Sequence, residues 1–385
     1  MIKCLFNLKW CTKLPQSESS IEISPKVLYQ KLRDGHKPFL LDVRGSQKHK
    51  EWKIFDSLNI PIMTLLSTKK EDLPPEFRSQ EIITICGSGN DSKIAAKDLQ
   101  KKGLNALSLE GGLTLWNSIF DHEEVLKNDG IKLIQFRRIA KGCLSYMLIE
   151  KDEALMIDPA FNLDPYLEYS RTNDITITKV IDTHLHADHV SGAINLAEKC
   201  DATLFLSSQD PYEFKSIEYT PIKHNDRFSL NGTYLKSIHT PGHTFGSYSF
   251  SINGFGILSG DTIFADGVGR PDLANKAREF ASDLYKSINF YKSLSHDMFI
   301  APAHHGKFTI EHFNKPLLTD VKTFIQSPMV DKSETEFVLY AVNRVESLPH
   351  PPSYQQIRNI NAGKTILAPN QINDLEIGPN RCAMN

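Results

Sequence analysis

One stretch constrains this chain more than any other: Thr183 to His189, which has the pattern His-x-His-x-Asp-His. It follows Thr176 to Thr183, where β-branched residues predict a strand. It precedes Ser191 to Lys199, which predicts a helix capped by Ser191. Three histidines and a carboxylate on one strand-to-helix loop can converge, and both side-chain types are common ligands of zinc and non-haem iron. The stretch therefore predicts a metal site.

Length and composition limit what else the chain can be. Its 385 residues exceed the usual size of one domain, so we expect two. The formal net charge of −2 gives no general attraction to nucleic acid, and no apolar run approaches the roughly 20 residues that span a membrane. Six cysteines without paired spacing do not predict a disulfide framework, so we expect a cytoplasmic protein.

The first half of the chain alternates predicted strands and helices. An apolar strand over Glu81–Cys86 runs into a short glycine-bearing loop, and a helix then begins near Ser92 and ends at Gly103. Cys86 lies directly before the positive end of that helix, which favours the reactive thiolate. A helix over Pro25–Arg33 and a strand over Pro38–Arg44 precede these elements.

Cys86 to Ser92, together with Leu109 to Trp116, resembles a rhodanese (sulfurtransferase) domain. The resemblance implies an α/β fold with a parallel sheet flanked by helices, and a persulfide carried on Cys86. Asp91 stands where many rhodaneses have an arginine, so an anionic donor such as thiosulfate would lose a cationic contact. Lys53 to Phe55 replaces the usual Gly-His-Ile segment. The alternative is a module that only binds or docks.

Polar residues from His122 to Gly130 end in a turn signal and predict a linker. We therefore predict an N-terminal extension over residues 1–19, a rhodanese-like domain over 20–122, a linker over 123–130 and a second domain over 131–385.

In the second half, further candidate ligands come at the ends of predicted strands. His243 follows a strand over Tyr234–His239, Asp261 ends one over Phe255–Asp261, and His304 ends one that begins at Phe299. Together with the histidine stretch, they resemble the metallo-β-lactamase superfamily, which implies an αββα sandwich with its ligands along one edge. In binuclear hydrolases of that superfamily, such as glyoxalase II, the matching residues would form two zinc sites. The first would use His184, His186 and His243; the second would use Asp188, His189 and His304; Asp261 would bridge them.

Finer motifs are similar to the persulfide dioxygenases. Gly260 to Asp272 contains a Gly-Arg-x-Asp segment after a candidate metal-binding Asp, and Gly378 to Ala383 resembles the end of those enzymes. The resemblance implies one Fe(II) per chain, held by His184, His243 and Asp261. Such a triad leaves positions open for a persulfide sulfur and O₂. The remaining residues would orient ligands and water: His186, Asp188, His189 and His304.

The same resemblance implies residues that contact the substrate. Arg270 would bind a glutathione carboxylate with its planar guanidinium, held in place by Asp272. Tyr146 and Cys382 would line the pocket. After His304 this chain has His305-Gly306, where the dioxygenases often have Asp-Tyr.

The fusion of the two halves supports one function. A carrier of sulfane sulfur suits an enzyme that oxidises it, so we expect oxidation of glutathione persulfide, or a similar thiol persulfide, by O₂ to sulfite and free thiol. Cys86 would exchange sulfane sulfur with that reaction. The alternative is a zinc thioester hydrolase with two zinc ions and a degenerate rhodanese module. The segment from Glu311 onward is suited to packing between subunits, as in a homo-oligomer.

Overall fold

The computed structural model describes residues 21–128, 130–210, 214–272, 276–306, 308–346, 353–378, 380 and 382–384. The predicted N-terminal extension lies outside these residues. The chain divides into two compact units: Met1–His49 with Ser57–Leu113, and Lys50–Asp56 with Thr114–Asn385. Among the described residues, no helix is long and apolar enough to cross a membrane.

The first unit is built on a five-stranded parallel sheet with the strand order β1-β5-β4-β2-β3. Its strands are β1 (Glu22–Ile23), β2 (Phe39–Asp42), β3 (Leu58–Asn59), β4 (Ile82–Ile85) and β5 (Ala106–Leu109). The four residues of β4 are all buried, as the apolar sequence predicts for a central parallel strand.

The helices of this region are α1 (Pro25–Arg33), α2 (Ser46–Glu51), α3 (Ile62–Ser67), α4 (Asn90–Lys101) and α5 (Gly112–Trp116), with 3₁₀ turns at Lys70–Asp72 and Pro75–Arg78. The helix predicted over Pro25–Arg33 is confirmed, and Ser24 caps it by accepting a hydrogen bond from Val27 N. The predicted strand-loop-helix around Cys86 is confirmed as β4 followed by α4. The α/β fold predicted for this half is therefore correct.

The second unit contains two sheets. One has seven strands in the order β12-β11-β10-β9-β8-β7-β6, antiparallel from β6 to β9 and parallel from β9 to β12. Its strands are β6 (Phe120–Asn128), β7 (Ile131–Arg138), β8 (Cys143–Glu150), β9 (Glu153–Ile157), β10 (Thr176–Ile181), β11 (Thr203–Leu206) and β12 (Thr220–Pro221).

The other sheet has six strands in the order β13-β14-β15-β16-β18-β19. Its strands are β13 (Arg227–Ser229), β14 (Tyr234–His239), β15 (Tyr248–Ile252), β16 (Gly256–Gly260), β18 (Phe299–Pro302) and β19 (Thr319–Asp320). A separate antiparallel pair joins β17 (Val268–Gly269) to β20 (Ala383–Met384), which ties the C-terminal segment to this unit.

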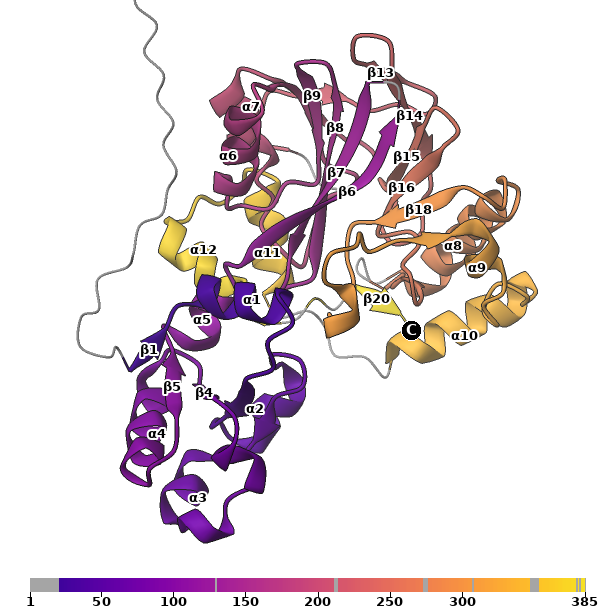
Figure 1. Ribbon diagram of the computed structural model, residues 1–385. Coiled ribbons are helices and arrows are strands. Elements are labelled where there is room, and N and C mark those ends of the chain that lie inside the picture. The colour runs from indigo at the N-terminus through magenta and orange to yellow at the C-terminus, as the bar shows by residue number, and fades with distance from the viewer. Residues whose placement is uncertain are drawn as a thin grey trace, which may run out of the picture. The chain divides into compact units, whose positions relative to one another are not determined.

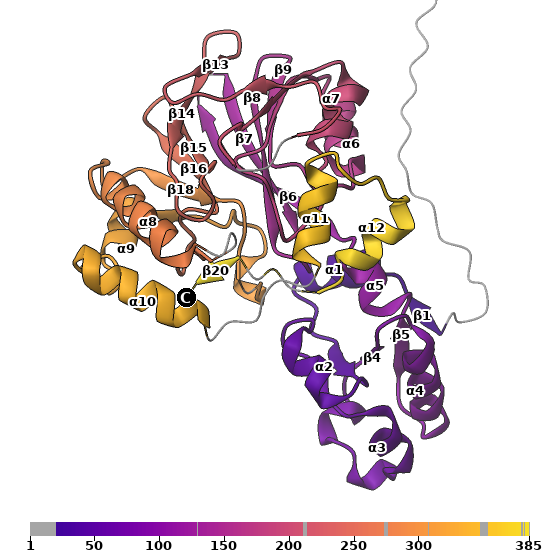
Figure 2. The same cartoon turned by 180° about the vertical axis from the view of Figure 1, so that it is seen from behind.

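Helices cover the outer faces of the two sheets, as Figures 1 and 2 show. On one side lie α6 (Asp164–Thr172) and α7 (Ala193–Cys200), and on the other lie α8 (Ala277–Lys292), α9 (Val321–Ile325) and α10 (Glu334–Glu346). Two further helices, α11 (Tyr354–Asn361) and α12 (Pro369–Leu375), follow. A separate apolar core lies beneath each helical layer. The αββα sandwich predicted for this half is confirmed.

Two local predictions differ from the structure. The predicted linker forms most of β6, an edge strand whose outward residues are polar, so its composition resembles that of a loop. The helix after the histidine stretch is capped by Gly192, and Ser191 Oγ instead accepts a hydrogen bond from Ala193 N, 3.0 Å away.

Candidate metal centre

The histidine stretch forms the loop between β10 and α7, where all its side chains are buried. His243 follows β14, Asp261 follows β16 and His304 follows β18. Of these strands, β16 and β18 are neighbours in the six-stranded sheet, whereas β10 belongs to the other sheet. Burying this many polar groups costs free energy unless hydrogen bonds or a metal compensate for it.

Five imidazoles share one arrangement: each ring has a hydrogen-bonding partner on one nitrogen. His186 Nε2 donates to Asp158, His189 Nδ1 to Asp188, His243 Nδ1 to Arg270 O and His304 Nδ1 to Asp261. Thr183 Oγ1 donates to Asp158 and therefore accepts from His184 Nδ1, 2.9 Å away.

The other nitrogen of four of these rings is buried and has no hydrogen-bond partner within the described chain: His184 Nε2, His186 Nδ1, His189 Nε2 and His243 Nε2. The exception is His304, whose Nε2 lies 3.0 Å from Asp188 Oδ2 as an ion pair. An imidazole that donates through one nitrogen and presents a bare lone pair with the other is the usual state of a metal-bound histidine. The donor set therefore fits a divalent metal such as zinc or iron, as the fold also implies.

Three residues converge as one group: His184, His243 and Asp261 have donor atoms within 4.8 Å of one another. Asp261 Oδ2 lies 3.7 Å from His184 Nε2 and 3.5 Å from His243 Nε2, and in the part of the chain that the structure describes it has no hydrogen-bond partner. Its other oxygen, Oδ1, accepts from His304 Nδ1 at 2.6 Å, which fixes the carboxylate. These are the three residues predicted to hold iron.

His186 belongs to a different group, with Asp158 and Asp182. Its Nε2 lies 3.1 Å from Asp158 Oδ1 and 3.9 Å from Asp182 Oδ1. Asp158 also accepts hydrogen bonds from Thr183 N and Oγ1. Burial, together with the charge of Asp158, raises the pKa of Asp182 to about 6, although His186 opposes the shift.

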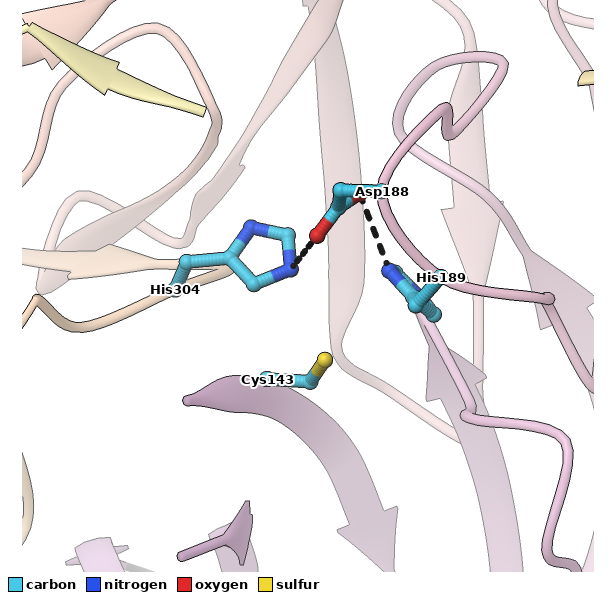
Figure 3. A group of neighbouring side chains, drawn as sticks. All are labelled: Cys143, Asp188, His189 and His304. Carbon is cyan, nitrogen blue, oxygen red and sulfur yellow. Dashed lines mark hydrogen bonds and ion pairs between the residues drawn. The ribbon is translucent and has the colours of Figure 1, made fainter. Parts of the chain in front are cut away.

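Asp188, His189 and His304 form a third group, which includes a residue the sequence did not single out, Cys143 (Figure 3). Asp188 Oδ1 lies 3.2 Å from His189 Nδ1, and its Oδ2 lies 3.0 Å from His304 Nε2. Burial favours a neutral thiol, but His189 and His304 overcome this effect and lower the pKa of Cys143 to about 6.

The direction of the pKa shift separates His184 and His243 from His304. Burial lowers the pKa of both His184 and His243. Burial also acts on His304, but the carboxylates of Asp188 and Asp261 raise its pKa well above the usual value. The pKa of Asp261 is lowered despite burial, chiefly by His304. The three predicted iron ligands therefore favour the metal-binding forms: two neutral imidazoles and a carboxylate.

Residues distant in sequence hold the histidine loop in place. Asn361 Nδ2 donates to the backbone oxygens of His186 and His189, at 2.9 Å each. Glu376 Oε1 accepts from Val190 N at 2.8 Å. Sequence reasoning missed both, because an Asn and a Glu in helical segments carry no pattern that points to a loop far away. Three other supporting residues were also missed. Asp158 accepts from Thr183 N, Asp210 accepts from Leu185 N, and Asn380 donates to Asp188.

Arg270 is fully buried and forms a bidentate pair with Asp272: its Nε and Nη2 each lie 2.7 Å from a carboxylate oxygen. The predicted pairing of these two side chains is therefore present. The backbone of Arg270 also contributes, because its oxygen accepts from His243 Nδ1 at 3.1 Å.

The two other predicted substrate-binding residues lie in different surroundings. Cys382 is buried with the carboxylates of Asp188 and Asp261, and burial together with these two charges raises the pKa of its thiol well above the usual value. Tyr146 lies in the core, where its hydroxyl donates to Pro302 O at 2.7 Å and accepts from Gln135 Nε2 at 2.9 Å. Its contacts join β8 to the end of β18.

Cys86 is buried at the start of the loop before α4. Gly89 N donates to its Sγ at 3.1 Å, and Ser92 Oγ lies 3.3 Å from the same sulfur. Gly112 packs so closely beneath the loop that a Cβ atom there would lie 2.4 Å from Cys86 O. The loop thus gives the sulfur one backbone donor, Gly89 N, while the Ser92 hydroxyl donates to Gly89 O.

Family models match both halves of the chain. Residues 24–119 match the rhodanese-like domain, and residues 138–304 match the metallo-beta-lactamase superfamily. The chain therefore combines a rhodanese-like domain with a metal-binding domain of the metallo-β-lactamase fold.

One relative of the second domain is a named hydrolase. A hydroxyacylglutathione hydrolase of Prochlorococcus marinus (strain MIT 9312) is 32% identical over 163 residues, which are 41% of this chain and 63% of that protein. The chain thus spans less than two thirds of that relative.

Two solved structures resemble the same domain. A metallo-beta-lactamase from Staphylococcus aureus subsp. aureus COL is 28% identical, with a TM-score of 0.56 over 62% of this chain and 75% of the other. ETHE1 from Myxococcus xanthus is 25% identical, with a TM-score of 0.52 over 64% of this chain and all of the other.

Proposed function

We propose that the metallo-β-lactamase domain is an Fe(II)-dependent dioxygenase that oxidises glutathione persulfide, or a closely similar thiol persulfide. The overall reaction converts the persulfide, O₂ and water to the free thiol, sulfite and two protons. The observation that carries this proposal is the convergence of His184 Nε2, His243 Nε2 and Asp261 Oδ2, three buried donor atoms without hydrogen bonds in the described chain, while His186 groups elsewhere.

Three protein donors suit this chemistry because they leave coordination positions open. Fe(II) held by such a triad supplies a centre at which a persulfide sulfur and O₂ can meet. The chain itself positions the donors: Thr183 Oγ1 orients His184, the Arg270 carbonyl orients His243, and His304 orients Asp261. All three ligands are buried, so the site limits the access of bulk water.

The comparisons support a glutathione-derived thiol as substrate, since one relative is a hydroxyacylglutathione hydrolase, and the likeness to ETHE1 from M. xanthus fits the proposal. We assign Arg270 the role of binding a carboxylate of the thiol peptide. Asp272 would hold the guanidinium in the required plane, as their bidentate contact suggests.

The rhodanese-like domain would carry sulfane sulfur on Cys86. The hydrogen bond from Gly89 N would stabilise a charged sulfur in that loop. Cys86→Ala should abolish persulfide formation in this domain, measured by intact mass after incubation with glutathione persulfide, and leave O₂ uptake nearly unchanged. Equal loss of both activities would contradict separate roles for the domains.

A second candidate is a binuclear zinc thioester hydrolase. The buried lone pair on His186 Nδ1 favours it, because that nitrogen would complete a first zinc site with His184 and His243. Asp188, His189 and His304 are also present for a second zinc ion.

Metal content and O₂ uptake decide between the two candidates. The full chain would be purified anaerobically, its metals measured, and O₂ consumption followed on addition of glutathione persulfide. We expect one iron per chain and persulfide-dependent uptake, with Asp261→Asn losing both iron and uptake while His186→Gln retains iron. Two zinc ions, no O₂ uptake and O₂-independent thioester cleavage would refute the dioxygenase.

A further inference from the structure

A cavity of about 200 Å³ lies in the second unit, and neither Arg270 nor any of the three proposed iron ligands lines it. Its walls come from segments that are distant in sequence, all of which belong to that unit: Lys50–Phe55, Trp116, Ile139–Gly142, and the residues His305, Gly306 and Phe308. The cavity is therefore separate from the site that we assign to the substrate.

Lys141 brings a buried positive charge to this cavity. It lies in the turn between β7 and β8, and only 5% of the residue is exposed. Among the residues that the structure describes, its ammonium group has no hydrogen bond or ion pair. A buried charge without a partner costs free energy, and an anion in the cavity would remove that cost.

His305 adds a second polar group without a partner. Both of its ring nitrogens are buried, and neither has a hydrogen-bond partner in the described part of the chain. A neutral imidazole has one N–H donor and one acceptor, so His305 can donate to an oxygen atom of an anion that Lys141 attracts.

Backbone contacts hold these two residues close together. His305 N donates to Gly142 O at 2.9 Å, and Asn380 N donates to Lys141 O at 3.1 Å. Gly142 has a φ of +90°, and a Cβ atom at this position would lie 2.6 Å from His305 O. The place of the two polar groups is thus set by the backbone, which makes this a preformed site.

The rest of the cavity wall is largely aromatic. Trp116 and Phe308 are buried, and Phe55 packs against Phe308 with ring centroids 6.0 Å apart. Trp52 is held in place because its Nε1 donates to Ala140 O at 3.0 Å. Such walls suit a ligand with an apolar body, and an apolar cavity of about 150 Å³ is large enough to bind benzene. About 200 Å³ therefore leaves room for a six-membered ring and a carboxylate.

The charges around the cavity also favour an anion. Lys50 and Lys53 are exposed and line the cavity together with Lys141, whereas Glu51 is the one acidic side chain among the described lining residues. The two exposed lysines would attract an anion, while the buried one would hold it.

We propose that this cavity binds a small organic acid, with its apolar body against the tryptophan and phenylalanine rings and its carboxylate on Lys141 and His305. An inorganic oxyanion would leave the aromatic walls without a contact. The inference goes beyond the proposed function and depends neither on a metal nor on the oxidation of a persulfide.

Tryptophan fluorescence of the full chain tests the proposal, because two of the three tryptophans, Trp52 and Trp116, line the cavity. The probe is cyclohexanecarboxylate, and its uncharged control is cyclohexanecarboxamide. We expect a saturable change in emission with the acid and at least tenfold weaker binding of the amide. No saturable change with the acid, or equal affinity for the two compounds, would overturn the proposal.

The variant Lys141→Met removes the charge and keeps a long apolar side chain. We expect it to bind the acid at least tenfold more weakly, because the carboxylate loses its buried partner. The matched control Lys132→Met changes a half-buried lysine of β7 that does not line the cavity, and should bind like wild type. Wild-type affinity in Lys141→Met would contradict the proposal.

Thermal unfolding without any ligand gives a second readout. Since Lys141→Met no longer buries an unpaired charge, its Tm should equal or exceed that of wild type. A clearly lower Tm would show that the ammonium group already has a partner within the protein, and would overturn the proposal.

A competition experiment distinguishes a free acid from the carboxylates of a thiol peptide. S-methylglutathione carries the carboxylates of glutathione but no reactive sulfur. At saturation it should leave the affinity for cyclohexanecarboxylate unchanged, as expected for two separate sites. Competition that disappears in Lys141→Met would assign the cavity to the thiol substrate and overturn the proposal.

This inference and the dioxygenase fail in different ways. Acid binding that depends on Lys141, in a protein without iron or O₂ uptake, would support the cavity site and refute the dioxygenase. Persulfide-dependent O₂ uptake without acid binding would support the dioxygenase and refute the cavity site.

Discussion

Asp210 joins the two loops that carry the histidines of the proposed iron triad. Its Oδ2 accepts from Leu185 N at 3.1 Å, and its Oδ1 accepts from Gly246 N at 2.8 Å. Leu185 is next to His184, and Gly246 lies three residues after His243. One buried carboxylate therefore holds both loops, and its replacement should weaken metal binding without removing a ligand.

The substitution Asp210→Asn keeps the size of the side chain but turns one acceptor into a donor. The amide oxygen can still accept from one N–H, while the other buried N–H faces an NH₂ group and loses its partner. A hydrogen bond to a charged group contributes about 1.5–3 kcal/mol. If metal binding must restore the loop arrangement, affinity should fall roughly 10- to 150-fold, at about 1.4 kcal/mol per tenfold. Replacing residues that orient ligands typically costs about 10- to 100-fold, which agrees.

The assay is anaerobic competition for Fe(II) between the metal-free full chain and a chelator of known affinity. Asp226→Asn is the matched control, because Asp226 also accepts from a backbone N–H, that of Lys223 at 2.8 Å, but on an exposed turn. We expect the control to bind iron like wild type. An unchanged affinity in a correctly folded Asp210→Asn protein would refute the claim that this carboxylate sets the spacing of the ligands.

Two further predictions concern stability. Arg137 and Asp121 form a buried ion pair that joins β7 to β6, so Arg137→Met should cost about 3–5 kcal/mol and lower Tm by roughly 6–20 °C, measured by calorimetry. The control Lys179→Met breaks a partly exposed pair with Glu153 and should cost less than about 1 kcal/mol; equal losses would contradict the argument from burial. Removing bound metal with a chelator should lower Tm by roughly 8–16 °C, reversibly, if the free metal had been about 1,000 times its Kd. An unchanged Tm after complete removal would show that the buried lone pairs do not need a metal for stability.

The sequence predicts the fold well because its strands are apolar and end abruptly in chemically distinctive residues. Asp261 and His304 each follow a run of buried residues, and parallel or neighbouring strands place such ends at one edge. The strand β6 was missed because an edge strand has polar outward side chains. The cap of α7 was missed because Ser and Gly are both acceptable at that position.

The supporting residues of the site could not be predicted in the same way. Asn361 contacts backbone atoms about 170 residues earlier in the chain, and its sequence surroundings indicate only an amphipathic helix. Cys143 begins an ordinary buried strand, and only the bridge to His304 brings it to the metal centre. Such contacts depend on tertiary packing, which local sequence patterns do not encode.

The pattern His-x-His-x-Asp-His does not by itself determine how many metal ions bind, because every residue in it can serve either as a ligand or as the partner of a ligand. The partners of the imidazole rings bear on that choice. Asp158 accepts a hydrogen bond from His186 Nε2, and Asp188 accepts one from His189 Nδ1. Each ring can therefore bind a metal only through its other nitrogen. The positions of these lone pairs, rather than the presence of the histidines, therefore separate a three-ligand iron site from a binuclear zinc site. His186→Gln offers a direct test of this choice, because it removes the ring while Asp158 continues to hold Thr183, which orients His184. If His186 is not a ligand, iron retention should change little, whereas a strong loss of metal would favour the hydrolase.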